Sequence, residues 1–306
     1  MTDFESVRIA LRALRVNTLR SALTMLGIII GVAAVVTMVS VGRGAHVQVA
    51  EQIRSLGTNL LTVSPGAARQ GGVRLESGSR RNLTESDARA IRAEVAAVEV
   101  AAPAVRGKAQ IVQGNRNWST SVFGTEPDYF LARDWGIGAG RMFTVQDVAS
   151  GAKVALIGDT VAEALFGGAD PLGRTVRIAN VPFTVAGVLA KKGPTGSGRD
   201  QDDAVFVPIS AAKLRLQLGS AVDRDAVDYI MVKLASVDAM ATAQADIRAL
   251  LRQRHRLRAD ADDDFAVYDP TAEMQAYQEA TRTFTLLVGA IASVSLLVGG
   301  ISIMNI

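Results

Sequence analysis

The sequence has no cysteine among its 306 residues and only two histidines, His46 and His255. Without cysteine the chain can form neither a disulfide framework nor a thiolate metal site. Neither histidine lies in an H-E-x-x-H pattern or another zinc-ligand spacing. The loop G-x-x-x-x-G-K-[ST], which holds nucleotide phosphates, is also absent. We therefore expect no metal and no cofactor.

A catalytic constellation is lacking as well, since no nucleophile can be paired with a general base from the sequence. Two acidic runs stand out, one formed by Asp200, Asp202 and Asp203 and the other by residues 260–264. Both lack the central glycine and closing glutamate of an EF-hand loop. We expect solvated turn acids in both runs, the second facing the arginines of residues 252–258. The sequence predicts no catalytic residues.

Outside the N-terminus the chain has no appreciable excess of positive charge. The formal net charge is +3, but four arginines and two acidic residues precede Ser21, which leaves 29 basic against 28 acidic residues in the rest of the chain. Non-specific binding of nucleic acid needs a patch of uncompensated lysine and arginine. This balance argues against nucleic acid as a partner.

Two long uncharged runs are present instead, Ser21 to Gly42 and Phe284 to Ile306. A helix of about 20 residues crosses the hydrocarbon core of a bilayer, so each run is long enough to span it. A signal peptide has a shorter apolar region, and Val41-Gly42-Arg43-Gly44 is a poor cleavage site. We expect transmembrane helices at residues 21–42 and 284–306.

Arginine is unevenly distributed around the first run, with four arginines before it and only Arg43 and Arg54 at a similar distance after it. Positive charge near a helix end stays in the cytoplasm. The residues between the two runs are therefore expected on the exported side.

Residues 1–20 combine an apolar stripe with adjacent arginines, which is typical of a helix lying on the cytoplasmic membrane surface. A solvated basic leader that only sets topology is the alternative. Residues 43–58 and 271–283 carry apolar residues at helical spacing, and we expect two stalk helices that pack together as a lever. The residues expected to make the coupling contacts are Leu11, Leu14 and Arg15 in the leader, Ile53 and Leu56 in the first stalk, and Met274 and Tyr277 in the second.

The exported part is expected to be an α/β subdomain made of residues 59–124 and 225–270. Its pattern is two βαβ units, with strands at 59–64, 104–113, 117–124, 228–234 and 265–268. One helix begins at Thr84, where Asp87 completes a capping box, and runs to about Val98. The other begins at an Asp238 cap and runs to about Arg254.

Residues 125–224 are expected to form a small β-rich subdomain inserted into the α/β one. Strands are predicted at 154–157, 175–178, 183–189 and 204–208, with a short helix at 160–166. Two stretches rich in glycine and polar residues are predicted as loops. Residues 66–81 are expected to be mobile, and residues 191–203 to project from the core.

Six segments carry a resemblance to a known family: ALRALRVNTLRSALTMLGIIIGVAAVV in the leader and first run, SLGTNLLTVSPG, STSVFGTEPDYF, DPLGRTVRI, DQDDAVFVP and the closing TLLVGAIASVSLLVGGISIMNI. Together they resemble the permeases of macrolide-exporter-type (MacB/FtsX-like) ABC transporters, and the resemblance covers nearly the whole chain. It implies a periplasmic domain with an α/β porter part and an inserted β part, between the first two of four spans.

The resemblance further implies a non-catalytic, homodimeric permease in the bacterial inner membrane. Its implied partners are a cytoplasmic ABC ATPase, a periplasmic adaptor and an outer-membrane channel, and its movements would expel a periplasmic substrate. The chain departs from the pattern by stopping at Ile306, before a third and fourth span, so a fragment is expected. Ser302 stands where the family pattern has glycine. Alternatives are a lipoprotein-release or cell-division permease, or a two-span sensor with a periplasmic ligand-binding domain.

Overall fold

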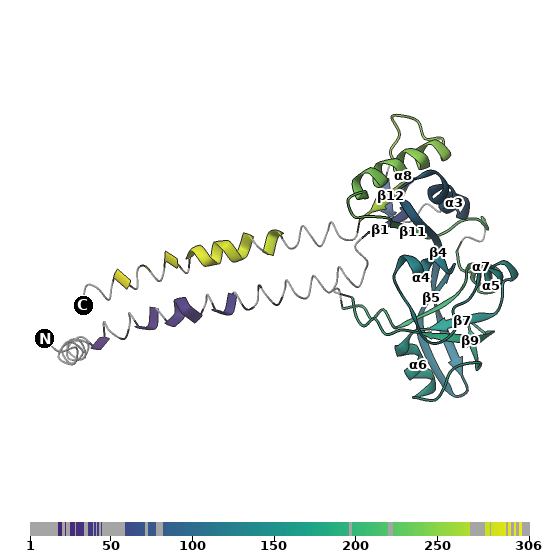
Figure 1. The fold of residues 1–306 in the computed structure, drawn as a ribbon, viewed down its shortest axis with the longest axis horizontal. Coiled ribbons are helices and arrows are strands. Elements are labelled where there is room, and N and C mark those ends of the chain that lie inside the picture. Colours follow the sequence, from purple (N-terminus) through teal and green to yellow (C-terminus); the bar gives the residue numbers. More distant parts are fainter. Residues whose placement is uncertain are drawn as a thin grey trace. The chain divides into compact units, whose positions relative to one another are not determined.

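The computed structural model of the chain has two compact units, one made of Met1–Glu51 with Ala272–Ile306 and the other of Gln52–Thr271. In the second unit the structure describes residues 59–70, 73–77, 82–195, 198–219 and 223–269. In the first it describes single residues and short runs between 18 and 44 and between 279 and 301. The backbone can be followed in Figure 1.

The described residues of the first unit are helical, and large apolar side chains on them, such as Ile29 and Leu286, are exposed. The two segments approach each other at Gly42, where an added Cβ would lie 3.5 Å from the Thr285 hydroxyl. Within the described residues, no helix is both long and apolar enough to cross a membrane. Residues 1–17, 45–58 and 271–278 are outside the described part.

Four strands and two helices of the larger unit follow one another as β-α-β-β-α-β: β1 (Leu60–Pro65), α3 (Glu85–Glu94), β4 (Val98–Gln113), β11 (Tyr229–Leu234), α8 (Met240–Arg254) and β12 (Phe265–Tyr268). Their order in the sheet is β12-β1-β11-β4, with every neighbouring pair antiparallel. Each helix therefore joins two parallel strands that have a third strand between them. This is the ferredoxin-like split βαβ arrangement.

Strand β4 is long enough to serve two parts of the sheet. Its first residues pair with β11, and residues from Ala104 onward pair with β5 (Arg116–Thr125). Gly114, with a φ of 55°, makes the turn between β4 and β5. The ten-stranded sheet thus continues from the ferredoxin-like part into the rest of the unit (Figure 1).

The stretch between β5 and β11 supplies the other elements: α4 (Asp128–Ala132), β6 (Ile137–Gly140), α5 (Val145–Ser150), β7 (Val154–Ile157), α6 (Asp159–Phe166), β8 (Thr175–Ile178), β9 (Val181–Leu189), β10 (Ala204–Pro208) and α7 (Ile209–Arg215). Beyond β5 the sheet order is β10-β7-β9-β6, with β8 pairing β4 and β9. The subdomain boundaries at 124/125 and 224/225 stay a prediction.

Apolar side chains cover both faces of the sheet, and β10 shows how they divide. Val205 and Val207 join a large core that includes residues of α3, α6, α7 and α8, whereas Phe206 joins a second core. Alternate residues of a strand point to opposite faces, so these helices lie over one face of the sheet. The second core is rich in aromatic residues from α4 and its surroundings, among them Tyr129 and Phe130.

Most predicted elements are confirmed, and the strands at 154–157, 175–178, 204–208 and 265–268 have the predicted ends. The Thr84–Asp87 capping box is confirmed too. The helix that it opens ends at Glu94, earlier than predicted, because Val98 already begins β4 and pairs with Leu234. Pairing across the sheet outweighs the helix propensity of this alanine-rich stretch.

The predicted Asp238 cap is wrong. Helix α8 begins at Met240 behind Ala239, and no side chain caps it. A backbone turn takes the place of the cap, since the Met240 amide donates to the Val237 carbonyl over 3.0 Å.

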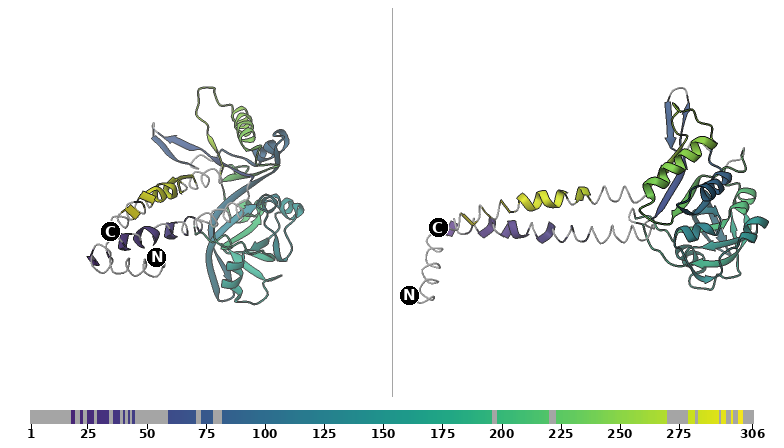
Figure 2. Two further views of the ribbon diagram at one scale, coloured as in Figure 1. Left: turned by 60° about the vertical axis from the view of Figure 1, so that its left-hand side comes forward. Right: turned by 45° about the horizontal axis from the view of Figure 1, so that its top comes forward.

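Both predicted loops also differ from the structure. Residues 66–81 include β2 (Ala67–Gln70) and β3 (Val73–Ser77), which form a separate two-stranded sheet (Figure 2). The sequence Gly71-Gly72 between them favours a hairpin, a signal that the loop assignment overlooked. Residues 191–203 do not simply project from the core, because Asp202 near their end is only 1% exposed.

Candidate functional site

The chain enters the larger unit through β1 and leaves it through β12, and these two strands are neighbours in the sheet. Thr62 of β1 lies opposite Tyr268 of β12 in an antiparallel ladder that continues to Pro65 and Phe265. Because the strands are antiparallel, the chain enters β1 and leaves β12 at the same end of this pair. The two connections to residues 43–58 and 271–283 therefore start beside each other.

The start of β1 is anchored to the end of β11. The Asn59 side-chain amide donates to the Leu234 carbonyl, and the Leu234 amide donates to the Asn59 carbonyl over 2.9 Å. The far end of β1 is fixed by Gly66, whose amide donates to the Asp264 carbonyl over 2.8 Å. Backbone approach is so close there that an added Cβ on Gly66 would lie 2.6 Å from the Asp264 carbonyl carbon.

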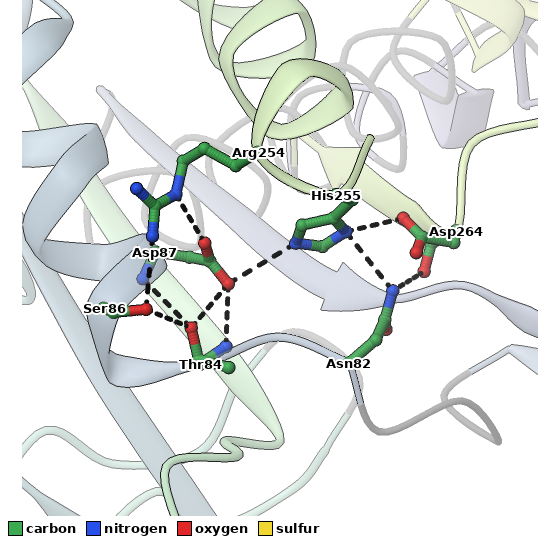
Figure 3. A network of polar contacts seen from close by, with 7 residues as sticks. All are labelled: Asn82, Thr84, Ser86, Asp87, Arg254, His255 and Asp264. Atoms are coloured by element: carbon green, nitrogen blue, oxygen red, sulfur yellow. Dashed lines mark hydrogen bonds and ion pairs between the residues drawn. The ribbon is translucent and has the colours of Figure 1, made fainter. Parts of the chain in front are cut away.

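A polar network lies at this far end, where β1 stops and β12 begins, and Figure 3 shows its seven residues. Asp87 of α3 is its first centre. One carboxylate oxygen accepts from Arg254 Nε at 2.7 Å, and the other accepts from the Thr84 backbone amide at 3.0 Å and the Thr84 hydroxyl at 2.7 Å. A single buried carboxylate thus caps α3 and fastens the end of α8 to it.

His255, directly after α8, is the second centre of the network. Its Nδ1 lies 2.8 Å from the Asp264 carboxylate and its Nε2 lies 3.4 Å from Asp87 (Figure 3). The Asn82 side-chain amide donates to the Asp264 carbonyl over 3.0 Å. Asn82 Oδ1 is buried, and no donor among the described residues reaches it. These contacts join α3, α8 and the beginning of β12.

The network shifts the pKa values of its titratable groups. Burial alone would raise the pKa of Asp87, but hydrogen bonds from His255, Thr84 and Arg254 hold it well below its usual range. The hydrogen bond to Asp87 raises the pKa of His255, and Asp264 adds to this effect, while burial opposes it. The arrangement therefore favours a protonated imidazole between two carboxylates.

The residues predicted to make coupling contacts lie outside the described part: Leu11, Leu14, Arg15, Ile53, Leu56, Met274 and Tyr277. Their packing stays a prediction. The sequence did not predict the network, because its members are far apart in the chain. One signal was available: Asp264 ends an acidic run directly before the buried strand residue Phe265, which makes a solvated role for it improbable.

The two acidic runs have structural roles rather than purely solvated ones. In the first run the Asp202 carboxylate accepts from the backbone amides of Lys192 and Gly193, at 2.9 and 2.8 Å. In the second run Asp263 pairs with Arg252, one of the arginines predicted to face it, and also with Arg248, which was not predicted. Asp264 is nearly buried, contrary to expectation. Across the part of the chain that the structure describes, no group of three metal-ligating residues could hold an ion.

Comparison with known proteins agrees with this architecture. The family model "MacB-like periplasmic core domain" matches residues 21–250. The macrolide export ATP-binding/permease protein MacB of Azoarcus sp. (strain BH72) is 40% identical over 307 residues, covering 100% of this chain and 44% of that protein. The protein of the same name from Syntrophobacter fumaroxidans is 37% identical, covering 98% and 49%. The chain spans about half the length of these curated relatives.

Two solved structures share the fold. The periplasmic region of MacB from Actinobacillus actinomycetemcomitans has a TM-score of 0.59 at 24% identity and covers 74% of this chain and 95% of its own. The extracellular domain of the ABC-type transporter YknZ from Gram-positive bacteria has a TM-score of 0.55 at 19% identity, covering 69% and 100%. Together with the matched family model and the identity to the curated relatives, the ferredoxin-like sheet and the elements inserted into it show that this chain belongs to the MacB-like periplasmic core domain family.

Proposed function

We propose that this chain is the non-catalytic permease subunit of an ABC-type export transporter, and that it transmits movement between a cytoplasmic ABC ATPase subunit and a periplasmic domain. Family membership supports a transport role, as do relatives named as macrolide export proteins. The pairing of β1 with β12 supports the mechanical part, because both connections to the flanking segments start from one ladder.

The proposal places residues 21–42 and 284–306 across the bacterial inner membrane as two spans of a multi-pass protein. Exposed apolar side chains on the helical residues of these runs support this placement. Large exposed apolar surface marks contact with lipid or with another protein. The arginines before Ser21 favour a cytoplasmic N-terminus and hence a periplasmic domain.

Force would pass through the two stalks, residues 43–58 and 271–283. In this proposal Ile53 and Leu56 pack against Met274 and Tyr277, and a pull on either stalk reaches the β1–β12 ladder. The leader, through Leu11, Leu14 and Arg15, would contact the ATPase from the membrane surface. We further propose a homodimer that works with a periplasmic adaptor and an outer-membrane channel.

A crosslink between the stalks tests the mechanical proposal. Because these 306 residues hold no cysteine, Ile53→Cys together with Tyr277→Cys adds one thiol pair to them, and any cysteine elsewhere in the full-length transporter or its ATPase is replaced by serine. Oxidation should reduce substrate export, since it restricts movement of one stalk against the other, while ATP hydrolysis persists. Export and hydrolysis are measured in reconstituted vesicles.

The same sample after reduction and the two single-cysteine variants are the controls, and all should export normally. Undiminished export by a verified crosslinked form would show that the stalks are spacers, and the mechanical proposal would fail. A two-span sensor with a periplasmic ligand-binding domain remains the rival function.

A further inference from the structure

Among the described residues, Arg133, which follows α4, has only neutral partners for its cationic group. Its guanidinium lies over the rings of Trp135 and Tyr129, 5.2 and 5.8 Å from their centres. One terminal nitrogen donates to the Tyr129 hydroxyl over 3.2 Å, and the other donates to Gln201 Oε1 over 2.6 Å. Among the described residues, no carboxylate lies within ion-pair distance of this guanidinium. A partly buried cation without a counter-ion is unfavourable, so it indicates a site that an anion could complete.

Gln201 provides a second, independent indication. The residue is only 7% exposed, and its Oε1 is engaged by Arg133. Its Nε2 is buried and finds no acceptor in the described part of the chain. Buried amide groups are nearly always hydrogen-bonded, so this donor lacks the acceptor that its surroundings call for. Gln201 Nε2 therefore lacks a hydrogen-bond acceptor, and the Arg133 guanidinium lacks an anionic one.

Lys192 adds positive charge beside these two residues. Its Nζ donates to the Arg133 carbonyl over 2.6 Å and lies 5.6 Å from the centre of the Trp135 ring. Burial and the nearby Arg133 lower the pKa of Lys192 to about 8, and Asp134 and Asp202 oppose this shift only in part. The Asp202 carboxylate already accepts from two backbone amides. Among the described contacts, those of Arg133 and Gln201 leave donors without a charged acceptor, and Lys192 adds positive charge beside them.

We propose that Arg133, Gln201 and Lys192 form a binding site for the carboxylate group of a ligand, either a small organic acid or the free carboxylate of a peptide. A planar carboxylate matches the planar donor edges of a guanidinium and a side-chain amide better than a tetrahedral phosphate does. The rings of Tyr129 and Trp135 hold the guanidinium in place, which reduces the entropy lost on binding. This inference does not depend on the transport function.

Tryptophan fluorescence can report binding, because Trp135 contacts both cations and Trp118 is the only other tryptophan in the chain. Trp118→Phe in the full chain, purified in detergent, makes Trp135 the single reporter. The probes are acetate, triglycine with a free carboxyl terminus, triglycine with an amidated carboxyl terminus, and inorganic phosphate, all at constant ionic strength. Calorimetry on the chain with both tryptophans repeats each titration.

We expect saturable binding of acetate or free triglycine, and the tighter of the two identifies the source of the carboxylate. Amidated triglycine should bind at least about tenfold more weakly, as expected when a charge-assisted hydrogen bond is lost. Gln201→Glu should weaken binding by a similar factor without lowering the melting temperature, because its carboxylate would pair with Arg133. Arg141→Gln, which removes a cation elsewhere, should leave affinity unchanged.

Several results would overturn the proposal. One is the absence of saturable binding by either carboxylate probe in both assays. Another is equal affinity in the parent and in Gln201→Glu, which would place any binding elsewhere. Phosphate binding tighter than both carboxylates would contradict the assigned ligand class.

Discussion

His255 shows how one residue can make the stability of the larger unit depend on pH. It lies between Asp87 and Asp264, with Arg254 and Asn82 as the other polar neighbours, and packs edge-on against Phe265. Its pKa is raised from the usual 6.5, mainly by the hydrogen bond to Asp87. Its stabilising contribution is therefore complete below pH 6.5 and is lost as the pH rises through the folded-state pKa.

We predict that the free energy of unfolding falls as the pH rises from 6.5 through the folded-state pKa of His255, and that His255→Gln removes most of this fall. Chemical denaturation at several pH values in this window measures the slope. His46→Gln is the matched control, because it removes the other histidine and should leave the slope intact. A slope that persists in His255→Gln would mean that another group is responsible.

The contribution of Asp87 to stability has the opposite pH dependence. It is present above the usual pKa of an aspartate and is lost as the pH falls below that value.

At the scale of elements, two helices begin with the same motif in different surroundings. Thr84 and Asp87 form a capping box at α3, and Thr144 and Asp147 form one at α5. Asp87 also pairs with Arg254, and its side chain is 5% exposed, whereas Asp147 pairs with the exposed Arg141 and is 17% exposed. Hydrogen bonds from Arg141 and Thr144 lower the pKa of Asp147 to about 2. The same sequence signal therefore contributes differently to stability.

Asp87→Ala should cost about 3 kcal/mol of unfolding free energy, because it breaks a buried ion pair and leaves Thr84 and Arg254 without their partner. Asp147→Ala should cost about 1 kcal/mol, the usual effect of losing a helix cap. Urea denaturation of both variants measures the difference. Equal costs would show that the ion pair with Arg254 adds little to the cap.

The junction between β1 and β12 gives the second prediction at this scale. Gly66→Ala would place a Cβ 2.6 Å from the backbone of Asp264, so one strand must move. We expect a loss of about 1 to 3 kcal/mol, as for other overpacked sites. Gly136→Ala is the control, because its added Cβ meets no atom within 4 Å, and its stability should stay within about 0.5 kcal/mol of the parent. If Gly66→Ala were as stable as Gly136→Ala, the junction would be more adaptable than the close approach indicates.

At the scale of the whole molecule, the proposed topology can be tested directly. A reporter that is active only in the periplasm, inserted after Gly193, should be active in cells that express the full chain, because the arginines before Ser21 favour export of the residues that follow. A reporter that is active only in the cytoplasm, inserted at the same place, should be silent. The reverse pattern would reject the proposed orientation and with it the periplasmic placement of the domain.

The separate elements of the domain were largely predictable because local chemistry specifies them. Alternating apolar residues predicted strands such as β8 and β10, and Thr84 with Asp87 predicted the start of α3. Local chemistry was misleading where a distant partner decided the outcome. Residues 95–98 have a helical pattern, yet Val98 pairs with Leu234 in the sheet. Asp202 lies in a polar run, yet its carboxylate is buried and accepts hydrogen bonds from two backbone amides.

The sequence by itself determined the two uncharged runs, the near-neutral charge of the part between them, the lack of thiol and phosphate-binding chemistry, and the order of most helices and strands. All of these depend on residue type or on spacing within a few residues. Only the tertiary structure decided that β11 lies between β1 and β4, that the chain enters and leaves on paired strands, and that Arg254 meets Asp87. Such contacts join residues more than 100 positions apart, as the 167 positions between Asp87 and Arg254 show, and no local pattern encodes which distant partner a group will find.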